Sequence, residues 1–299
     1  MAKEKSMQCS RRDFLVFALI TPGLAALSIP ALSGVSVAQQ NRGGVPMKYH
    51  EVTVAHFSPT GSTAKLALRL GSALADKITE LDMTAQQLQS HAISSDIMVM
   101  AVPVYSGRVP GRAVEALRLI SGKGQPCVGI VVYGNRAFDD ALVELADIAD
   151  EQGFSFIAAG GFIGQHSLVS EIGANRPDAQ DLAEIDSFGL NILDAVRAGN
   201  TSAPLKIPGN RPYLAPSSLK VPILASDACT SCGLCAERCP VAAIPLDELH
   251  VTNTEKCILC MRCIRNCPVQ ARSLPPQVQE QFRTYLQNFV KRREPQTFF

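Results

Sequence analysis

Several patterns that would define a function are missing from this 299-residue chain. Its formal net charge is only +1, so it has no basic field of the kind that binds nucleic acid. It lacks the P-loop pattern G-x-x-x-x-G-K followed by Ser or Thr, which argues against a nucleotide triphosphatase, and it lacks the G-x-G-x-x-G fingerprint of a dinucleotide site. Disorder is also excluded, because 46% hydrophobic and 18% charged residues are enough for about two packed domains.

Cysteine carries the strongest signal. Eight of the ten cysteines form two copies of C-x-x-C-x-x-C-x-x-x-C-P. Three thiolates spaced by two residues can bind one cubane, whereas the fourth reaches the other cluster. We therefore expect two [4Fe-4S] clusters. The ligands expected for one are Cys229, Cys232, Cys235 and Cys267, and those for the other are Cys257, Cys260, Cys263 and Cys239.

Four disulfides or two zinc sites are the alternatives for eight cysteines. Disulfide frameworks rarely repeat this spacing, and zinc usually takes two C-x-x-C pairs. The repeat of 28 residues from Cys229 to Cys257 resembles the bacterial two-cluster ferredoxins. That resemblance implies a small α+β ferredoxin domain at 223–274.

The N-terminus contains Ser10, Arg11, Arg12, Phe14 and Leu15, followed by an apolar stretch that Pro and Gly interrupt. It resembles a twin-arginine (Tat) signal peptide, and we expect residues 1–38 to be removed after Ala38. The alternative is an uncleaved membrane anchor. This pathway exports folded proteins, so clusters loaded in the cytoplasm could reach the periplasm without their thiols forming disulfides.

The middle of the chain alternates between strand and helix patterns. β-rich runs occupy 51–57, 78–81, 97–101, 128–133 and 156–163, and helical segments lie at 64–70, 112–120, 139–152 and 179–197. This alternation predicts an α/β domain at 48–200 with a five-stranded, doubly wound parallel sheet. Ligands of such sheets bind beyond the carboxyl ends of the strands.

A turn rich in hydroxyl groups follows the first strand: Ser58, Thr60, Gly61, Ser62 and Thr63. Hydroxyls and the amides of a helix N-terminus can bind a phosphate group, and Gly61 lets the backbone approach it. The alternative is a simple helix N-cap.

This turn resembles the S/T-x-T-G-x-T phosphate loop of flavodoxins. The resemblance implies bound FMN, with Tyr105, Ser106, Gly107 and Arg108 as one wall of the flavin site. It implies Tyr133, Gly134, Asn135 and Arg136 as the other wall. The chain has no Trp, unlike the flavodoxins that stack one on the ring. His166 follows the fifth strand as a candidate near the flavin or a solvated histidine, and Cys127 is expected to be a core residue.

Residues 201–222 are Pro-rich and predict a stiff linker. At 275–299 the apolar spacing predicts a C-terminal amphipathic helix over 277–293 that packs on one of the domains. A second interpretation is peripheral association with a membrane, because the segment contains the basic residues Lys291, Arg292 and Arg293.

The two domains together resemble the iron-sulfur flavoproteins of the EFR-type ferredoxin family. The combination implies an electron carrier, because clusters transfer single electrons and FMN holds one or two. Without a nicotinamide site, we expect electrons to be exchanged with a protein redox partner, and we assign no catalytic side chain. The alternatives are a flavin-dependent reductase of a small molecule, and a flavin-free ferredoxin whose flavodoxin-like domain is structural.

Changing both Arg11 and Arg12 to Lys tests the export prediction. The variant is expected to stay in the cytoplasm, because this pathway requires the paired arginines. Immunoblotting of periplasmic and cytoplasmic fractions measures this, and normal export of the variant contradicts the targeting prediction.

Overall fold

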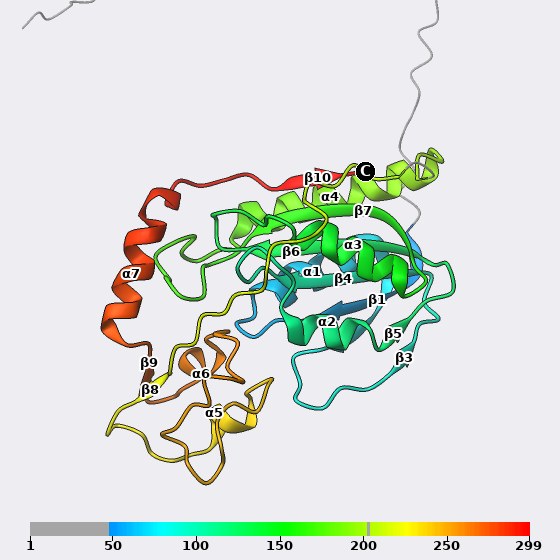
Figure 1. Ribbon diagram of the computed structural model, residues 1–299. Coiled ribbons are helices and arrows are strands. Elements are labelled where there is room, and N and C mark those ends of the chain that lie inside the picture. The colour runs from blue at the N-terminus through cyan, green and yellow to red at the C-terminus, as the bar shows by residue number, and fades with distance from the viewer. Residues whose placement is uncertain (1–47, 202–203) are drawn as a thin grey trace, which may run out of the picture. The chain divides into compact units, whose positions relative to one another are not determined.

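The computed structural model describes residues 48–201 and 204–299, so the signal peptide expected at 1–38 lies outside the described residues. Five strands pair in parallel, and they are β1 (Tyr49–His56), β2 (Ala75–Asp82), β4 (Ile97–Pro103), β6 (Pro126–Tyr133) and β7 (Ser155–Ile163). Their spatial order is β2-β1-β4-β6-β7 (Figure 1). In chain order this is 2-1-3-4-5, the flavodoxin-like order, so the predicted fold class is confirmed.

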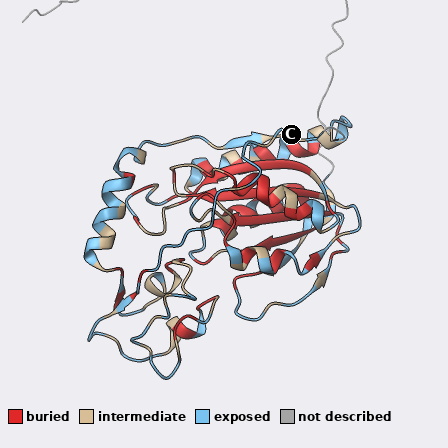
Figure 2. Cartoon of the chain, viewed as in Figure 1, coloured by how far each residue is buried: buried red, intermediate tan, exposed pale blue. Residues whose placement is uncertain are grey.

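Helices cover both faces of this sheet. α1 (Ser62–Leu74) and α4 (Ala179–Arg197) pack on one face, whereas α2 (Gly111–Leu117) and α3 (Ala141–Glu151) pack on the other. Strand β4 is buried from Ile97 to Val102, and alternate side chains enter the two cores (Figure 2). A strand buried on both sides explains the continuous apolar run. β3 (His91–Ala92) and β5 (Ile120–Ser121) form a separate two-stranded pair.

The second folded part contains β8 (Leu224–Ala225), α5 (Leu234–Glu237), α6 (Arg262–Arg265) and β9 (Arg272–Ser273). β8 and β9 pair antiparallel and bring the two ends of this part together. We call residues 223–274 the ferredoxin module. None of the helices in the described part of the chain is long and apolar enough to cross a membrane.

The C-terminal segment departs from the expected single helix. α7 (Pro276–Leu286) continues into the 3-10 helix η1 (Gln287–Phe289) and ends there, and the chain then forms β10 (Gln296–Phe298). β10 pairs antiparallel with β7 and adds a sixth strand to the sheet. The helix stops early because the backbone of the following residues bonds to the α/β domain, where the Asn135 side chain donates to the carbonyls of Phe289 and Lys291.

Two of the three consecutive basic residues Lys291, Arg292 and Arg293 are bonded within the chain. Arg292 pairs with Asp178 and Asp181, and Arg293 donates to the carbonyl of Arg136. The interpretation of membrane association rested on these positive charges, and those of Arg292 and Arg293 are bonded within the chain instead.

The linker is fixed along α3. The buried carboxylate of Asp140 accepts bonds from the backbone and side chain of Asn210 and from the amide of Leu214. Asp147 accepts from Arg211 and from the Tyr213 hydroxyl. Burial alone would raise the pKa of Asp140, but the bonds from Leu214 and Asn210 bring it below its ordinary value. The linker therefore holds a defined course on the domain.

Replacing Asp140 by Ala tests this attachment. The change leaves the amides of Asn210 and Leu214 without their acceptor, so the free energy of unfolding is expected to fall by about 1–3 kcal/mol. The linker should also become sensitive to chymotrypsin at Tyr213. Urea unfolding at pH 7 and limited proteolysis measure the two effects.

The matched control is Asp194→Ala, which removes an exposed pair with Arg197 on α4 and should change the unfolding free energy little. Because a carboxylate with a lowered pKa stabilises the fold above that pKa, the difference between D140A and the unmodified protein should shrink as the pH falls. Equal stability of the two proteins at pH 7 would contradict the proposed attachment.

Candidate functional site

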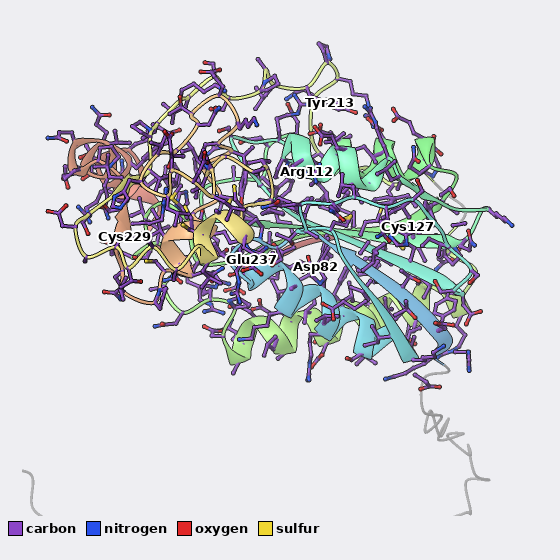
Figure 3. The ribbon with its side chains drawn as sticks, turned by 90° about the horizontal axis from the view of Figure 1, so that it is seen from below. Asp82, Arg112, Cys127, Tyr213, Cys229 and Glu237 are labelled. Carbon is purple, nitrogen blue, oxygen red and sulfur yellow. The ribbon has the colours of Figure 1, made fainter. Side chains whose placement is uncertain are left out.

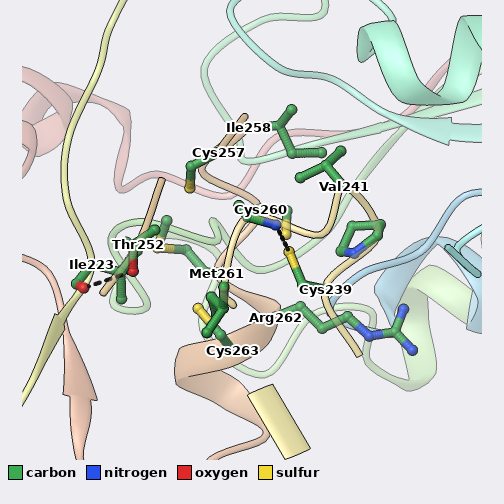
Figure 4. A pocket seen from close by; sticks show the side chains of 13 residues that line it. Ile223, Cys239, Val241, Thr252, Cys257, Ile258, Cys260, Met261, Arg262 and Cys263 are labelled. Carbon is green, nitrogen blue, oxygen red and sulfur yellow. Dashed lines mark hydrogen bonds between the residues drawn. The ribbon is translucent and has the colours of Figure 1, made fainter. Parts of the chain in front are cut away.

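Two cavities in the ferredoxin module are lined by the eight cysteines. One is surrounded by Cys239, Cys257, Cys260 and Cys263 (Figure 4). The other is surrounded by Cys229, Cys232, Cys235 and Cys267. Each cavity thus receives three thiols from one motif and the fourth from the other, which is the grouping expected from the spacing. We call them the inner cavity (Cys257 group) and the outer cavity (Cys229 group).

The module has a repeated backbone. Left-handed residues occur in three pairs, each 28 positions apart: Ser231 and Leu259, Gly233 and Met261, Ala242 and Gln270. The crossing cysteines are also equivalent, because the Ala243 amide donates to Cys239 Sγ and the Ala271 amide donates to Cys267 Sγ, each at 3.2 Å. Hydrogen bonds to sulfur are among the means by which a protein tunes a cluster's reduction potential.

The thiols of the inner cavity fit a bound metal cluster. Burial raises the pKa of Cys260 to about 12 and that of Cys263 to about 11. In such surroundings a thiolate needs a compensating cation, which iron would supply. No group of three or more His, Cys, Asp or Glu side chains in residues 48–201 and 204–299 is placed to hold a single metal ion. The thiols instead surround cavities, as a multi-iron cluster requires.

The two cavities differ in exposure. Cys239 and Cys260 of the inner cavity are only 9% and 8% exposed, whereas Cys232 of the outer cavity is exposed to solvent. Cys127, by contrast, is fully buried on β6 in the α/β core, far from Cys229 in Figure 3. Burial raises its pKa far above the ordinary range, as expected of a core residue.

Arg272 is a functional candidate that the sequence did not reveal. It is 3% exposed, and its Nη1 lies 3.5 Å from Cys235 Sγ and 2.7 Å from the carbonyl oxygen of Leu249. Its Nη2 donates to Thr252 Oγ1, and Thr252 lines the inner cavity. One buried cation therefore lies between the two thiol groups. The one feature of the sequence that could have suggested this role is that Arg272 follows the second cysteine motif, two residues before Leu274 at the end of the ferredoxin module.

The phosphate loop has the expected local geometry. Thr60 and Gly61 are exposed, Gly61 has a φ of 92°, and a Cβ built on Gly61 would meet no atom within 4 Å. Ser58 Oγ accepts from the Ala64 amide and caps the start of α1, and Thr63 is buried. Ser62 packs against Gly164. The open backbone at the N-terminus of a 13-residue helix fits an anionic phosphate.

The first flavin wall forms a tight turn. Tyr105 and Arg108 exchange backbone hydrogen bonds across Ser106 and Gly107, both left-handed. Burial, with a further contribution from Cys260, raises the pKa of Tyr105 well above its ordinary value. Tyr105 lines the cavity between the two domains described below, together with Cys257 of the inner cavity. The Arg108 guanidinium pairs with Glu144 and lies over the Tyr213 ring, and Arg108 also lines the cavity between the two domains that is described below.

The second wall differs from the expectation. The Tyr133 ring is buried in the core and contacts Phe138 edge-on, with 5.6 Å between the ring centroids. Asn135 is buried and bonded to the C-terminal segment, and Arg136 pairs with Asp139. The His166 ring packs against Gly134 instead, where a Cβ would lie 2.2 Å from His166 Cδ2. The side chains of Tyr133, Asn135 and Arg136 thus do not face a ring pocket, and His166 takes their place.

His166 is neutral at pH 7. Its Nδ1 accepts from the amides of Leu168 and Val169, so Nε2 carries the proton. Burial, together with the nearby Arg136 charge, lowers the pKa of His166 to about 4.

A cavity of about 290 Å³ lies between the two domains. Tyr105, Ser106, His166 and Leu168 line it from the α/β side, and Lys220 lines it from the linker. Cys257 and Ile258 line both this cavity and the inner cavity. We call it the interdomain cavity. It has room for a planar ring beside the Tyr105 turn, so the residues present fit FMN at the phosphate loop and at one of the two expected walls.

Comparison with known proteins identifies the second domain. Residues 228–271 match the profile of the 4Fe-4S dicluster domain. No curated protein matches the chain.

The solved structures that match resemble the α/β part. Rubredoxin oxygen:oxidoreductase from the anaerobe Desulfovibrio gigas is 15% identical, with a TM-score of 0.37 over 52% of this chain and 38% of that one. The Flv1 flavodiiron core from Synechocystis sp. is 17% identical, with a TM-score of 0.35 over 51% of this chain and 37% of that one. Oxidised flavodoxin 1 from Bacillus cereus is 14% identical, with a TM-score of 0.35 over 48% of this chain and 97% of that one. The chain thus matches little more than a third of the length of the first two. Similarity at this level says nothing about what this chain binds.

A dicluster domain joined to a flavodoxin-like fold supports a role in electron transfer. The domain match likewise supports iron-sulfur clusters as its cofactors.

Replacing Arg272 by Met tests the role of the buried cation. Loss of the positive charge between the cavities should make both clusters harder to reduce, because a nearby cation stabilises the more negative reduced state. Spectroscopic redox titration should show lower reduction potentials at unchanged iron content. Arg272→Lys, which retains the charge, should shift them less, and unchanged potentials in R272M would contradict the assignment.

Proposed function

We propose that this protein is a periplasmic electron-transfer iron-sulfur flavoprotein, exported folded by the twin-arginine pathway. It relays electrons between two [4Fe-4S] clusters and FMN, and it exchanges them with a protein redox partner. The carrying observation is the position of Cys257, which lines the inner cavity and also the interdomain cavity beside the Tyr105 turn.

The chain's own residues suggest how each cofactor would be held. The eight cysteines would bind iron in the two groups described above. The amides and hydroxyls of Thr60, Gly61, Ser62 and Thr63 would hold the phosphate of FMN. Tyr105, Ser106 and Gly107 would form the wall next to the ring. When bound, FMN supplies a centre that stores one or two electrons.

The exposure of the thiols suggests an order for the relay. The inner cavity lies against the α/β domain, where Ile258 packs on the core and Gln86 donates to the carbonyls of Ala236 and Glu237. The outer cavity is the more exposed one. Electrons would therefore pass between solvent and FMN through the outer cluster first and the inner cluster second.

One observation favours the flavin-free alternative. The loop after β6, which the resemblance assigns to the flavin, is occupied by His166 and by the backbone of Phe289 and Lys291. In that case the clusters alone would carry electrons, and the α/β domain would be structural.

Cofactor analysis of protein purified anaerobically from its native host separates these functions. The relay predicts about eight irons per chain together with one FMN. Full iron without flavin would favour the flavin-free alternative, and absence of iron would refute both.

Thr60→Asp tests the phosphate loop. A carboxylate at this exposed position repels the phosphate but suits a helix N-terminus, so flavin should be lost while iron and fold are kept. Ser187→Asp, which changes an exposed serine on α4, is the control and should retain both cofactors. Equal flavin content in T60D and the unmodified protein would contradict the assigned site.

A further inference from the structure

The exposed surface over the outer cavity has features of its own. Cys232 is exposed, and Pro268, Val269 and Leu249 line the cavity around it. Val269 is 42% exposed, and Leu246, three residues before Leu249 in the sequence, is 73% exposed. An apolar area around an exposed redox ligand is suited to transient contact with another protein.

Acidic residues surround this area. Asp227 precedes Cys229 by two positions, and Asp247 and Glu248 directly precede Leu249; all three are exposed. We call the surface formed by Asp227, Cys232, Leu246 to Glu248 and Val269 the outer cluster face.

Charge is divided between the two halves of the module. Residues 223–255 contain Asp227, Glu237, Asp247, Glu248 and Glu255, and Arg238 is their single Lys or Arg. Residues 256–272 contain Lys256, Arg262, Arg265 and Arg272 and no Asp or Glu. Arg238 follows Glu237, whose carbonyl oxygen binds Gln86 of the α/β domain, so it belongs to the end of the module that meets that domain. Arg272 also lines the outer cavity but is buried, so the exposed charges of the outer cluster face are those of Asp227, Asp247 and Glu248.

We propose that the outer cluster face docks a protein electron carrier whose own face has Lys and Arg residues around an apolar centre. This inference rests on the proposed function, because it requires the outer cluster to be loaded. Opposite charges steer such partners together and raise the association rate, while a small apolar contact lets them separate after transfer. The inner cluster does not serve this purpose, since Cys239 and Cys260 are buried.

The test uses one redox probe in two charge forms. A strongly basic c-type cytochrome, and the same cytochrome with succinylated lysines, each oxidise the anaerobically reduced protein in stopped-flow experiments. The basic form should react faster, and its rate should fall as salt is added, because screening weakens the attraction. The succinylated form should react more slowly.

The double variant D247K/E248K should lower the rate of the basic form by about threefold or more and weaken its salt dependence. The matched control reverses two exposed acids of the α/β domain, E115K/E151K, which changes the net charge equally. It should leave the rate within about a factor of two, because these charges lie on the α/β domain and are not part of the outer cluster face. An unchanged cluster absorption spectrum checks that both variants are folded and loaded.

Three results would overturn the proposal. One is a rate that D247K/E248K leaves unchanged, and another is an equal decrease in E115K/E151K. The third is a concentration-dependent dimer that D247K/E248K dissociates, because the basic half of a second copy would then be the occupant of this face. Each of these leaves the relay itself intact, whereas protein without iron would refute the relay and this surface together.

Discussion

The structure of the ferredoxin module depends on the exchange of one cysteine between its two motifs. Cys239 leaves the first motif to join the inner group, and Cys267 leaves the second to join the outer group. Neither group of four can form from one motif alone, so the halves must fold together. Since metal binding of this kind is coupled to folding, assembly of the two clusters would fix the whole module as a unit.

This coupling determines what each cluster can contact. The module has an approximate two-fold repeat, yet its halves contact the α/β domain differently: Ile258 of the second half packs on the core, whereas Ala236 and Glu237 of the first half accept hydrogen bonds from Gln86. Symmetry in the ligands is therefore accompanied by asymmetry in the surroundings: one group of thiols becomes internal and the other remains at the surface. In the proposed relay, this asymmetry would separate the position of a protein partner from that of FMN.

The sequence predicted those features that depend on local pattern. The five parallel strands follow from runs such as 97–101, and the grouping of the cysteines follows from their spacing, because both are short-range regularities. Features that depend on distant contacts were missed. Arg272 acquires its position by reaching from β9 to Leu249 and Thr252, and no local pattern marks it. Tyr133 looks like a ligand contact in sequence but lies in the core, because the last residue of a buried strand can face either way. Whether the named residues bind iron and FMN stays a prediction.

Strand β10 changes how the domains of this chain are to be counted. It is the last segment of the sequence, yet it pairs with β7 of the α/β domain, and Phe299 contacts Phe188 of α4. The ferredoxin module is thus inserted into the α/β fold and does not follow it. The edge of β7 stays available for pairing with other chains until residues 296–298, which follow the ferredoxin module in the sequence, have been synthesised. Pairing of β10 with β7 therefore requires that the whole intervening module has already been translated, so the sheet gains its sixth strand only after the cysteine motifs exist.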